Sequence, residues 1–128
     1  MASAKINHRF NFQFSLLEDD DFTYVAEQAN DDFDCELWVD DGDGVRVLCN
    51  PSDGNLPDWQ RVAVTVAELQ ANTGEYSATF TPLVPRDHRV VVRHFGSARH
   101  HARDVQVTTA DTTDVSLAVG GSITGLPG

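Results

Sequence analysis

Apolar side chains recur at every second residue through most of this chain. The clearest run places its apolar positions at Phe10, Phe12, Phe14 and Leu16, with polar residues between them. A period of two is the signature of a strand with one buried face, whereas an amphipathic helix repeats every 3.6 residues. The spacing therefore predicts an all-β fold.

Shorter runs of the same kind, bounded by Gly, Pro, Asn and Asp, predict further strands. We expect them at residues 22–29, 35–39, 45–49, 59–66, 75–81, 89–95, 103–109 and 114–119. Residues 51–57 read as a surface loop, and 67–71 as one helical turn. Short strands between turn residues favour an antiparallel β-sandwich of about 7–9 strands. Residues 1–119 are expected to form one domain, and the Gly-rich residues 120–128 a tail that is disordered or becomes ordered on a neighbour.

A hairpin is expected at residues 40–44, because glycines there supply the positive φ angles of a tight loop. If the hairpin is centred on Gly42, Cys35 faces Cys49 across the two strands. Opposed Cβ atoms lie ~4.5–5.5 Å apart, slightly wide for the ~3.8 Å mean of a disulfide. Two readings stay open: a bridge formed after the chain leaves a reducing compartment, or two small buried apolar residues.

The charge pattern restricts both setting and partners. Fifteen of the twenty acidic residues are aspartates, Lys5 is the single lysine, and the net charge is −11. Abundant Asp with scarce Lys suits solubility at high salt, which favours a halophilic or marine setting. Nucleic acid is not expected as a partner, because its binding requires a dense cationic face. A membrane is not expected either, since no apolar run approaches the ~20 residues of a spanning helix.

One stretch resembles a known family. Residues 72–82, followed by 87–93 and 103–107, resemble the second half of immunoglobulin-like β-sandwich domains of tailed-virus structural proteins. The family's Gly-x-Tyr-x-x-x-Phe-x-Pro strand is matched by Gly74, Tyr76, Phe80 and Pro82. The likeness covers roughly residues 35–109. It implies a virion component that coats a capsid or decorates a tail, fibre or baseplate, with no active site to carry over.

Three acidic runs, at 18–21, 30–34 and 40–44, raise the question of calcium, which takes six to eight oxygen ligands. None fits the EF-hand loop. The candidate ligands for Ca²⁺ are Asp40, Asp41 and Asp43, because a glycine-containing turn can wrap its carboxylates around an ion. The alternative, which we favour, is that these runs are solvated, salt-tolerant loops.

Four of the five histidines lie close together in the sequence, at His88, His94, His100 and His101. Imidazoles can bind zinc, and His94 and His100 flank the turn at 96–97, so they could approach each other across a hairpin. Structural zinc sites usually combine histidine with cysteine, and both cysteines are distant in the sequence. A polar hairpin with exposed rings is the favoured interpretation.

The charges are also divided along the chain. Residues 18–53 hold thirteen acids and one arginine, whereas residues 86–103 hold five arginines and one acid. Two interpretations stay open: opposite patches that allow head-to-tail association, or two solvated faces without a partner. The expected assembly interface consists of Arg86, Arg89, Arg93, Arg99, Arg103 and the outward-facing Trp38. The expected partners are other virion proteins and copies of the chain itself.

These expectations converge on a structural or accessory protein of a tailed virus, made in the host cytoplasm and located in the virion. Capsid decoration is placed ahead of a tail, fibre or baseplate role. The rival function is a carbohydrate- or cell-surface-binding module whose site would consist of Trp38, Trp59, Tyr24 and acidic loop residues. We expect no enzyme activity, because the sequence places no acid/base pair and no activated nucleophile.

Overall fold

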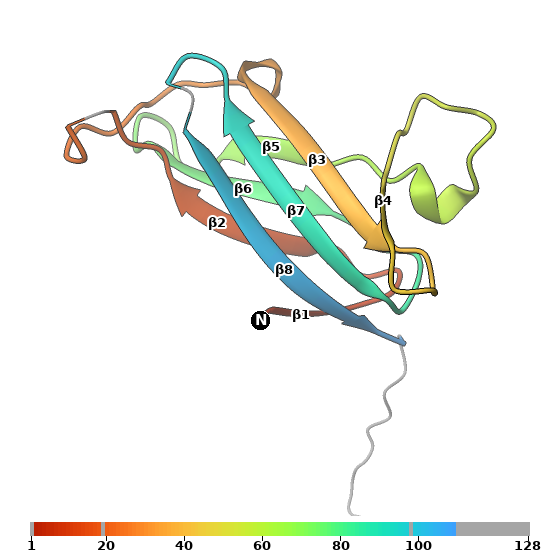
Figure 1. Cartoon of the computed structure of the whole chain (residues 1–128). Helices are drawn as coiled ribbons and strands as arrows, with labels where there is room; N and C mark the ends of the chain where they lie inside the picture. Colours follow the sequence, from red (N-terminus) through yellow and green to blue (C-terminus); the bar gives the residue numbers. More distant parts are fainter. Residues whose placement is uncertain (1, 19, 98, 110–128) are drawn as a thin grey trace, which may run out of the picture.

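Two β-sheets pack face to face in the computed structural model, which describes residues 2–18, 20–97 and 99–109 (Figure 1). The strands are β1 (Ala2–Lys5), β2 (Phe10–Ser15), β3 (Phe33–Asp40), β4 (Arg46–Leu48), β5 (Thr65–Glu68), β6 (Glu75–Phe80), β7 (Asp87–His94) and β8 (His100–Thr108). Two short 3-10 turns, η1 (Asn30–Asp32) and η2 (Asp58–Gln60), interrupt the loops. The predicted all-β class is confirmed, and the architecture is a β-sandwich. The expected strand at 114–119 and the tail at 120–128 lie outside the described residues.

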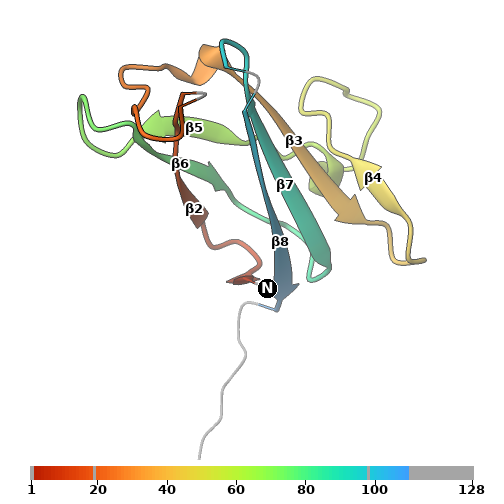
Figure 2. The same ribbon diagram turned by 60° about the vertical axis from the view of Figure 1, so that its left-hand side comes forward.

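The larger sheet has the strand order β1-β8-β7-β3-β4, and the smaller one β2-β6-β5 (Figure 2). Neighbouring strands are antiparallel, with one exception that the sequence did not indicate. β1 pairs with β8 in parallel, with Ala2 beside Val105 and Lys5 beside Thr108. The entirely antiparallel arrangement that we expected is therefore wrong at this edge of the larger sheet.

The core lies between the sheets and is formed by the alternate positions of the strands. Tyr76, Leu37 and Val90 are fully enclosed there. Around them the aromatic rings interlock, with Phe14 stacked on Tyr76 at 5.7 Å and Phe33 edge-on to Tyr76 at 5.4 Å between ring centroids. Burying each such side chain contributes roughly 1.5–3 kcal/mol, which explains why the alternation dictates the fold.

Three expected segments differ from the structure. Residues 59–66 are not one strand, because η2 contains Trp59 and β5 begins at Thr65. The helical turn expected at 67–71 is also wrong, since residues 65–68 pair with β6 as a strand. Residues 22–29 contribute one isolated bridge, Leu17 with Tyr24, instead of a strand. In the part of the chain that is described, no helix has the length and apolar character needed to cross a membrane.

The β3–β4 hairpin forms, but in a different register. Val39 pairs with Val47, not with Val45, so the turn is centred on Asp43. Both flanking glycines have positive φ angles, 99° at Gly42 and 86° at Gly44, and the longer loop uses both. The backbone N–H of Cys49 donates to the carbonyl of Leu37 at 2.8 Å. Cys49 therefore does not face Cys35, and the expected geometry for a cross-strand disulfide is absent.

Candidate interaction surfaces

The outer face of the larger sheet carries ordered rows of side chains. Pairing places Leu48, Trp38, Arg89 and Asp104 in one row across β4, β3, β7 and β8. The next row consists of Glu36, Val91 and Ala102, and the one after it of Asp34, Arg93 and His100. We call the eight residues Asp34, Glu36, Trp38, Leu48, Arg89, Val91, Arg93 and Asp104 the sheet face. Its partly exposed apolar side chains, Leu48 and Trp38, lie toward the β4 edge, and its charged side chains lie beside them on β3, β7 and β8.

Ion pairs link neighbouring strands across the sheet face. Arg89 donates to Asp104 Oδ1 at 2.9 Å, and Arg46 approaches the same oxygen at 3.4 Å. Arg93 lies 3.0 Å from Glu36 Oε2 and 3.9 Å from Asp34 Oδ2. Exposed pairs of this kind add ~0–1 kcal/mol to stability. Their main consequence is therefore that the side chains hold fixed positions on the surface.

The same contacts lower the pKa values of two acids on the sheet face. A hydrogen bond from Arg89 is the main reason that the pKa of Asp104 lies below its ordinary value. At Glu36, partial burial favours the protonated acid, but hydrogen bonds from Arg93 and Trp38 outweigh it and lower the pKa. The indole N–H of Trp38 donates to Glu36 Oε1 at 3.2 Å, which fixes the orientation of the ring. Both carboxylates are therefore ionised at neutral pH.

The five arginines of the expected interface do not form one surface. Arg89 and Arg93 lie on the sheet face with Trp38. Arg86 sits over the Trp59 ring, with 5.2 Å between its guanidinium carbon and the ring centroid. Two others face elsewhere: Arg99 donates to Asp21 Oδ1 at 2.7 Å, and Arg103 covers the Phe12 ring at 5.1 Å.

The histidines are not the exposed rings that we expected. His88 and His94 are buried, because they alternate with Val90 and Val92 on the inner face of β7. His94 is held at both nitrogens, by the Ser97 hydroxyl and the Gln28 amide oxygen, each at 2.8 Å. The interpretation as a polar hairpin with exposed rings is wrong for this pair. The missed signal was the period-two spacing of the two histidines with those valines.

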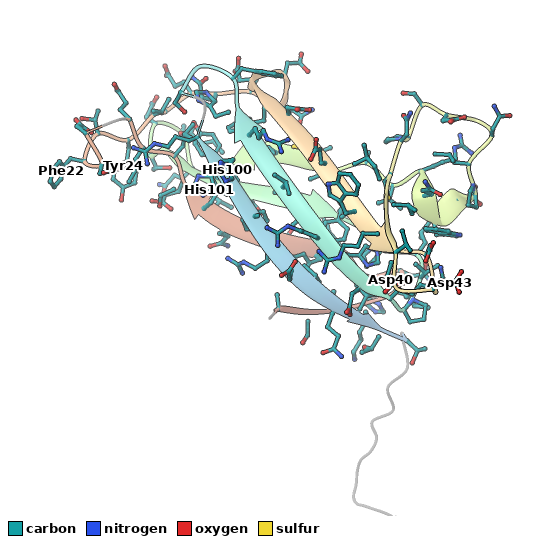
Figure 3. All side chains as sticks on the ribbon, in the orientation of Figure 1. Phe22, Tyr24, Asp40, Asp43, His100 and His101 are labelled. Carbon is teal, nitrogen blue, oxygen red and sulfur yellow. The ribbon has the colours of Figure 1, made fainter. Side chains whose placement is uncertain are left out.

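The two histidines considered for zinc lie on opposite faces of the sheet. His94 points into the core, while His100 pairs with Arg93 on the outer face. His101 points inward and stacks on Phe14 at 4.6 Å between ring centroids. Figure 3 labels His100 and His101 side by side on β8. Within the described ranges, no group of three His, Cys, Asp or Glu side chains is arranged to hold a metal ion.

The calcium candidates use their carboxylates within their own turn. Asp40 Oδ1 accepts the backbone N–H of Gly42 at 2.7 Å, and Asp41 Oδ1 accepts that of Asp43 at 2.8 Å. These are Asx-type contacts, which stabilise a loop locally without a bound ion. The structure therefore explains the aspartates as turn residues, and it does not bring Asp40, Asp41 and Asp43 together as a ligand set.

Both cysteines are free thiols in apolar surroundings. Burial raises the pKa of Cys35 to about 11, with a further contribution from Asp34, and burial also raises the pKa of Cys49 to about 11. Because the thiolate is the reactive form, we expect alkylation at pH 8 to be roughly 100-fold slower in the folded protein than in the urea-unfolded chain. Timed labelling with iodoacetamide and mass spectrometry measures both rates. Rapid labelling of either cysteine in the folded protein contradicts the burial described here.

The aromatic residues of the carbohydrate reading lie on different surfaces. Trp38 belongs to the sheet face, whereas Trp59 is partly buried against the core near Cys49. Tyr24 lies in the loop after β2, where its Cβ packs against the backbone at Gly74. A sugar platform made of these three residues is therefore not present. No cleft or cavity is found in the described part of the chain.

Comparisons with known proteins add no family assignment. No protein-family model matches the sequence, and the search of curated proteins gives no match.

Proposed function

We propose that the chain is a structural or accessory protein of a tailed virus, with capsid decoration as its role, built on an immunoglobulin-like sandwich. The order of the strands supports the fold. An immunoglobulin domain places its second, fifth and fourth strands in one sheet and its third, sixth and seventh in the other. If β4 is left out of the count, β5 to β8 become the fourth to seventh strands. The sheet β2-β6-β5 then faces β3-β7-β8 in the same order, and β4 and β1 are additions at the edges of the larger sheet.

The sheet face is the observation that carries the proposal. Trp38 is half-buried and outward, Leu48 is exposed beside it, and Val91 is buried beneath the neighbouring side chains. Aromatic residues within a frame of ordered charges are typical of contact centres between proteins. Because the arginines are already paired, docking on this face orders few further side chains, which lowers its entropic cost.

A weak contact through the sheet face is sufficient if it is repeated at many identical sites on a particle. A standard contact buries ~800 Å² on each partner, and many identical attachment sites on a particle raise the overall avidity. Fixed alternating charges also give the contact a defined register, because a shifted partner would place like charges together. Ion pairs weaken with salt, while apolar contacts do not, so the Trp38 centre suits a halophilic host.

The test is mass spectrometry of particles purified from the virus whose genome encodes the chain. The proposal expects the chain at a fixed copy number per particle. A copy number that scales with the major capsid protein supports decoration, whereas a low number set by the rotational symmetry of a tail indicates a tail or baseplate. Absence of the chain from washed, infectious particles overturns the proposal.

Trp38→Arg tests the surface itself, by adding the chain back to particles that lack it. We expect at least about a 10-fold loss of bound copies, because a buried contact centre is replaced by a charge. Trp38→Phe keeps an apolar ring and is expected to retain most binding. The control is Gln13→Arg, an exposed strand position on the smaller sheet. If Trp38→Arg and Gln13→Arg lose bound copies equally, with unchanged melting temperatures, the sheet face is not the surface that binds the particle.

A further inference from the structure

One end of the sandwich presents large apolar side chains to solvent. We call the three segments 17–29 without residue 19, 69–74, and 95–99 without residue 98 the loop end. Phe22 is 83% exposed, Phe95 68%, and Tyr24 and Leu69 50% each. Figure 3 shows Phe22 and Tyr24 projecting at this end, with Asp40 and Asp43 at the opposite end. Single exposed apolar residues are ordinary, but four on three neighbouring loops indicate an interaction surface.

Hydrogen bonds between the loops hold this end together. Tyr76 donates its hydroxyl to the Val25 carbonyl at 2.7 Å, and the backbone N–H of Leu16 donates to the Gly74 carbonyl at 2.9 Å. The third loop is tied to the first by Arg99, which donates to the Glu18 carbonyl at 2.6 Å. The exposed side chains are therefore carried by one connected unit.

The loop that carries Phe22 is fixed by Asp20. One oxygen of Asp20 accepts the backbone N–H groups of Phe22 and Thr23, both at 2.8 Å. These bonds, led by one from the Thr23 hydroxyl, lower the pKa of Asp20 to about 2. Glu68 acts in the same way on the next loop, where its carboxylate accepts the N–H of Gly74 at 3.0 Å and of Thr73 at 3.2 Å. Preorganised loops lose little conformational entropy on binding.

Charge identifies the kind of partner. The described residues of the first segment include four acids, Glu18, Asp20, Asp21 and Glu27, and no basic residue, and Arg99 is the single basic residue described in the other two segments. That arginine is already paired with Asp21. A rim of this sign attracts lysine and arginine and repels an anionic bilayer surface.

We propose that the loop end docks onto a partner protein whose apolar pockets are flanked by lysine or arginine. Phe22 and Phe95 would enter the pockets, and the acids would pair with the basic rim. This surface is separate from the sheet face, so the chain could hold two partners at once. The inference does not rest on a virion role.

The probes are three synthetic peptides of equal length. The first contains leucine, tryptophan and lysine, and the second contains the same apolar residues with glutamate in place of lysine. The third contains lysine with serine and glycine in place of the apolar residues. Fluorescence anisotropy with the full chain gives the dissociation constants. We expect the first peptide to bind at least about 10-fold more tightly than the others, and its affinity to fall as salt rises. Chemical-shift changes in the wild-type protein should fall within 20–24, 69–74 and 95–97.

Phe22→Ser combined with Phe95→Ser is expected to weaken binding of the first peptide at least about 10-fold. The control is Val45→Ser, because Val45 is 56% exposed and lies in the β3–β4 hairpin at the other end. The proposal is overturned if the third peptide binds as tightly as the first, or if the double variant binds the first peptide as tightly as the wild type does. It is also overturned if Val45→Ser weakens that binding as much as the double variant does. It is also overturned if the double variant abolishes binding to phosphatidylcholine vesicles or self-association in sedimentation, since lipid or a second copy would then be the occupant.

Discussion

Replacing Tyr76 with alanine is expected to lower the free energy of unfolding by about 3–5 kcal/mol, a large fraction of the ~5–15 kcal/mol typical of a domain. Tyr76 is fully buried and touches both Phe14 and Phe33, so its ring joins β6 to the strands on either side of the core. Truncation leaves a cavity that the surrounding strands cannot fill. Urea unfolding followed by tryptophan fluorescence measures the change.

Tyr76→Phe separates the ring from the hydroxyl group. The hydroxyl donates to the Val25 carbonyl and accepts the Gln28 N–H at 3.2 Å, so its removal leaves two backbone groups without that partner. This variant is expected to cost about 1–3 kcal/mol. If the alanine variant proves no less stable than the phenylalanine variant, the ring does not have the packing role described here.

Acidification below pH 6.5 is expected to destabilise the protein well before its carboxylates are protonated. His88 is fully enclosed, His101 packs on Phe14, and Nε2 of each ring has no hydrogen-bond partner. Burial lowers the pKa of both imidazoles below 6.5, and at His101 the nearby His100 and Arg99 lower it further. Well above pH 6.5 both rings are neutral in the folded and unfolded chain alike, so these histidines cost no stability there.

As the pH falls through 6.5, the unfolded chain binds more protons at these histidines than the folded protein does, and the free energy of unfolding decreases. The decrease ends once the pH is below the folded pKa values. Three carboxylates affect stability only at lower pH, because their pKa values lie below the ordinary 3.8 of Asp and 4.5 of Glu: Asp104, Glu36 and Glu68. Urea unfolding between pH 7.5 and 5 therefore isolates the histidines.

His101→Phe keeps the stack on Phe14 and removes the titrating group, so we expect it to flatten the His101 part of the pH dependence. His100→Ser is the matched control, since His100 is the exposed neighbour on the same strand. The control should retain most of the wild-type slope. A wild-type stability that stays constant from pH 7.5 to 5 contradicts the burial of His88 and His101.

Period-two spacing was enough to locate the strands that build the core. It placed β2 and β6 within a residue or two, because Phe12, Phe14 and Tyr76 have few alternatives to a buried face. It failed where local composition was ambiguous. The valines at 62, 64 and 66 alternate, yet the strand begins only at Thr65, which pairs with Thr79 next to the end of β6 at Phe80.

The surfaces were harder to predict, because they depend on register and on contacts distant in the sequence. A hairpin centred on Gly42 and one centred on Asp43 use the same turn residues, yet they place different pairs opposite each other. The arginines appeared as one basic run in the sequence, but successive strand residues face opposite sides of a sheet. Arg93 and Arg103 therefore end on different faces, one beside Glu36 and the other over Phe12.

The pairing of β1 with β8 has a consequence for synthesis. Ala2 and Val105 are neighbours in the sheet, although they lie far apart in the sequence. A ribosome must therefore release the chain through β8 before the larger sheet can close. Contacts of such long range raise the contact order and slow folding. Until β8 has emerged, β1 lacks its partner strand, and its unpaired backbone groups are open to pairing with another chain.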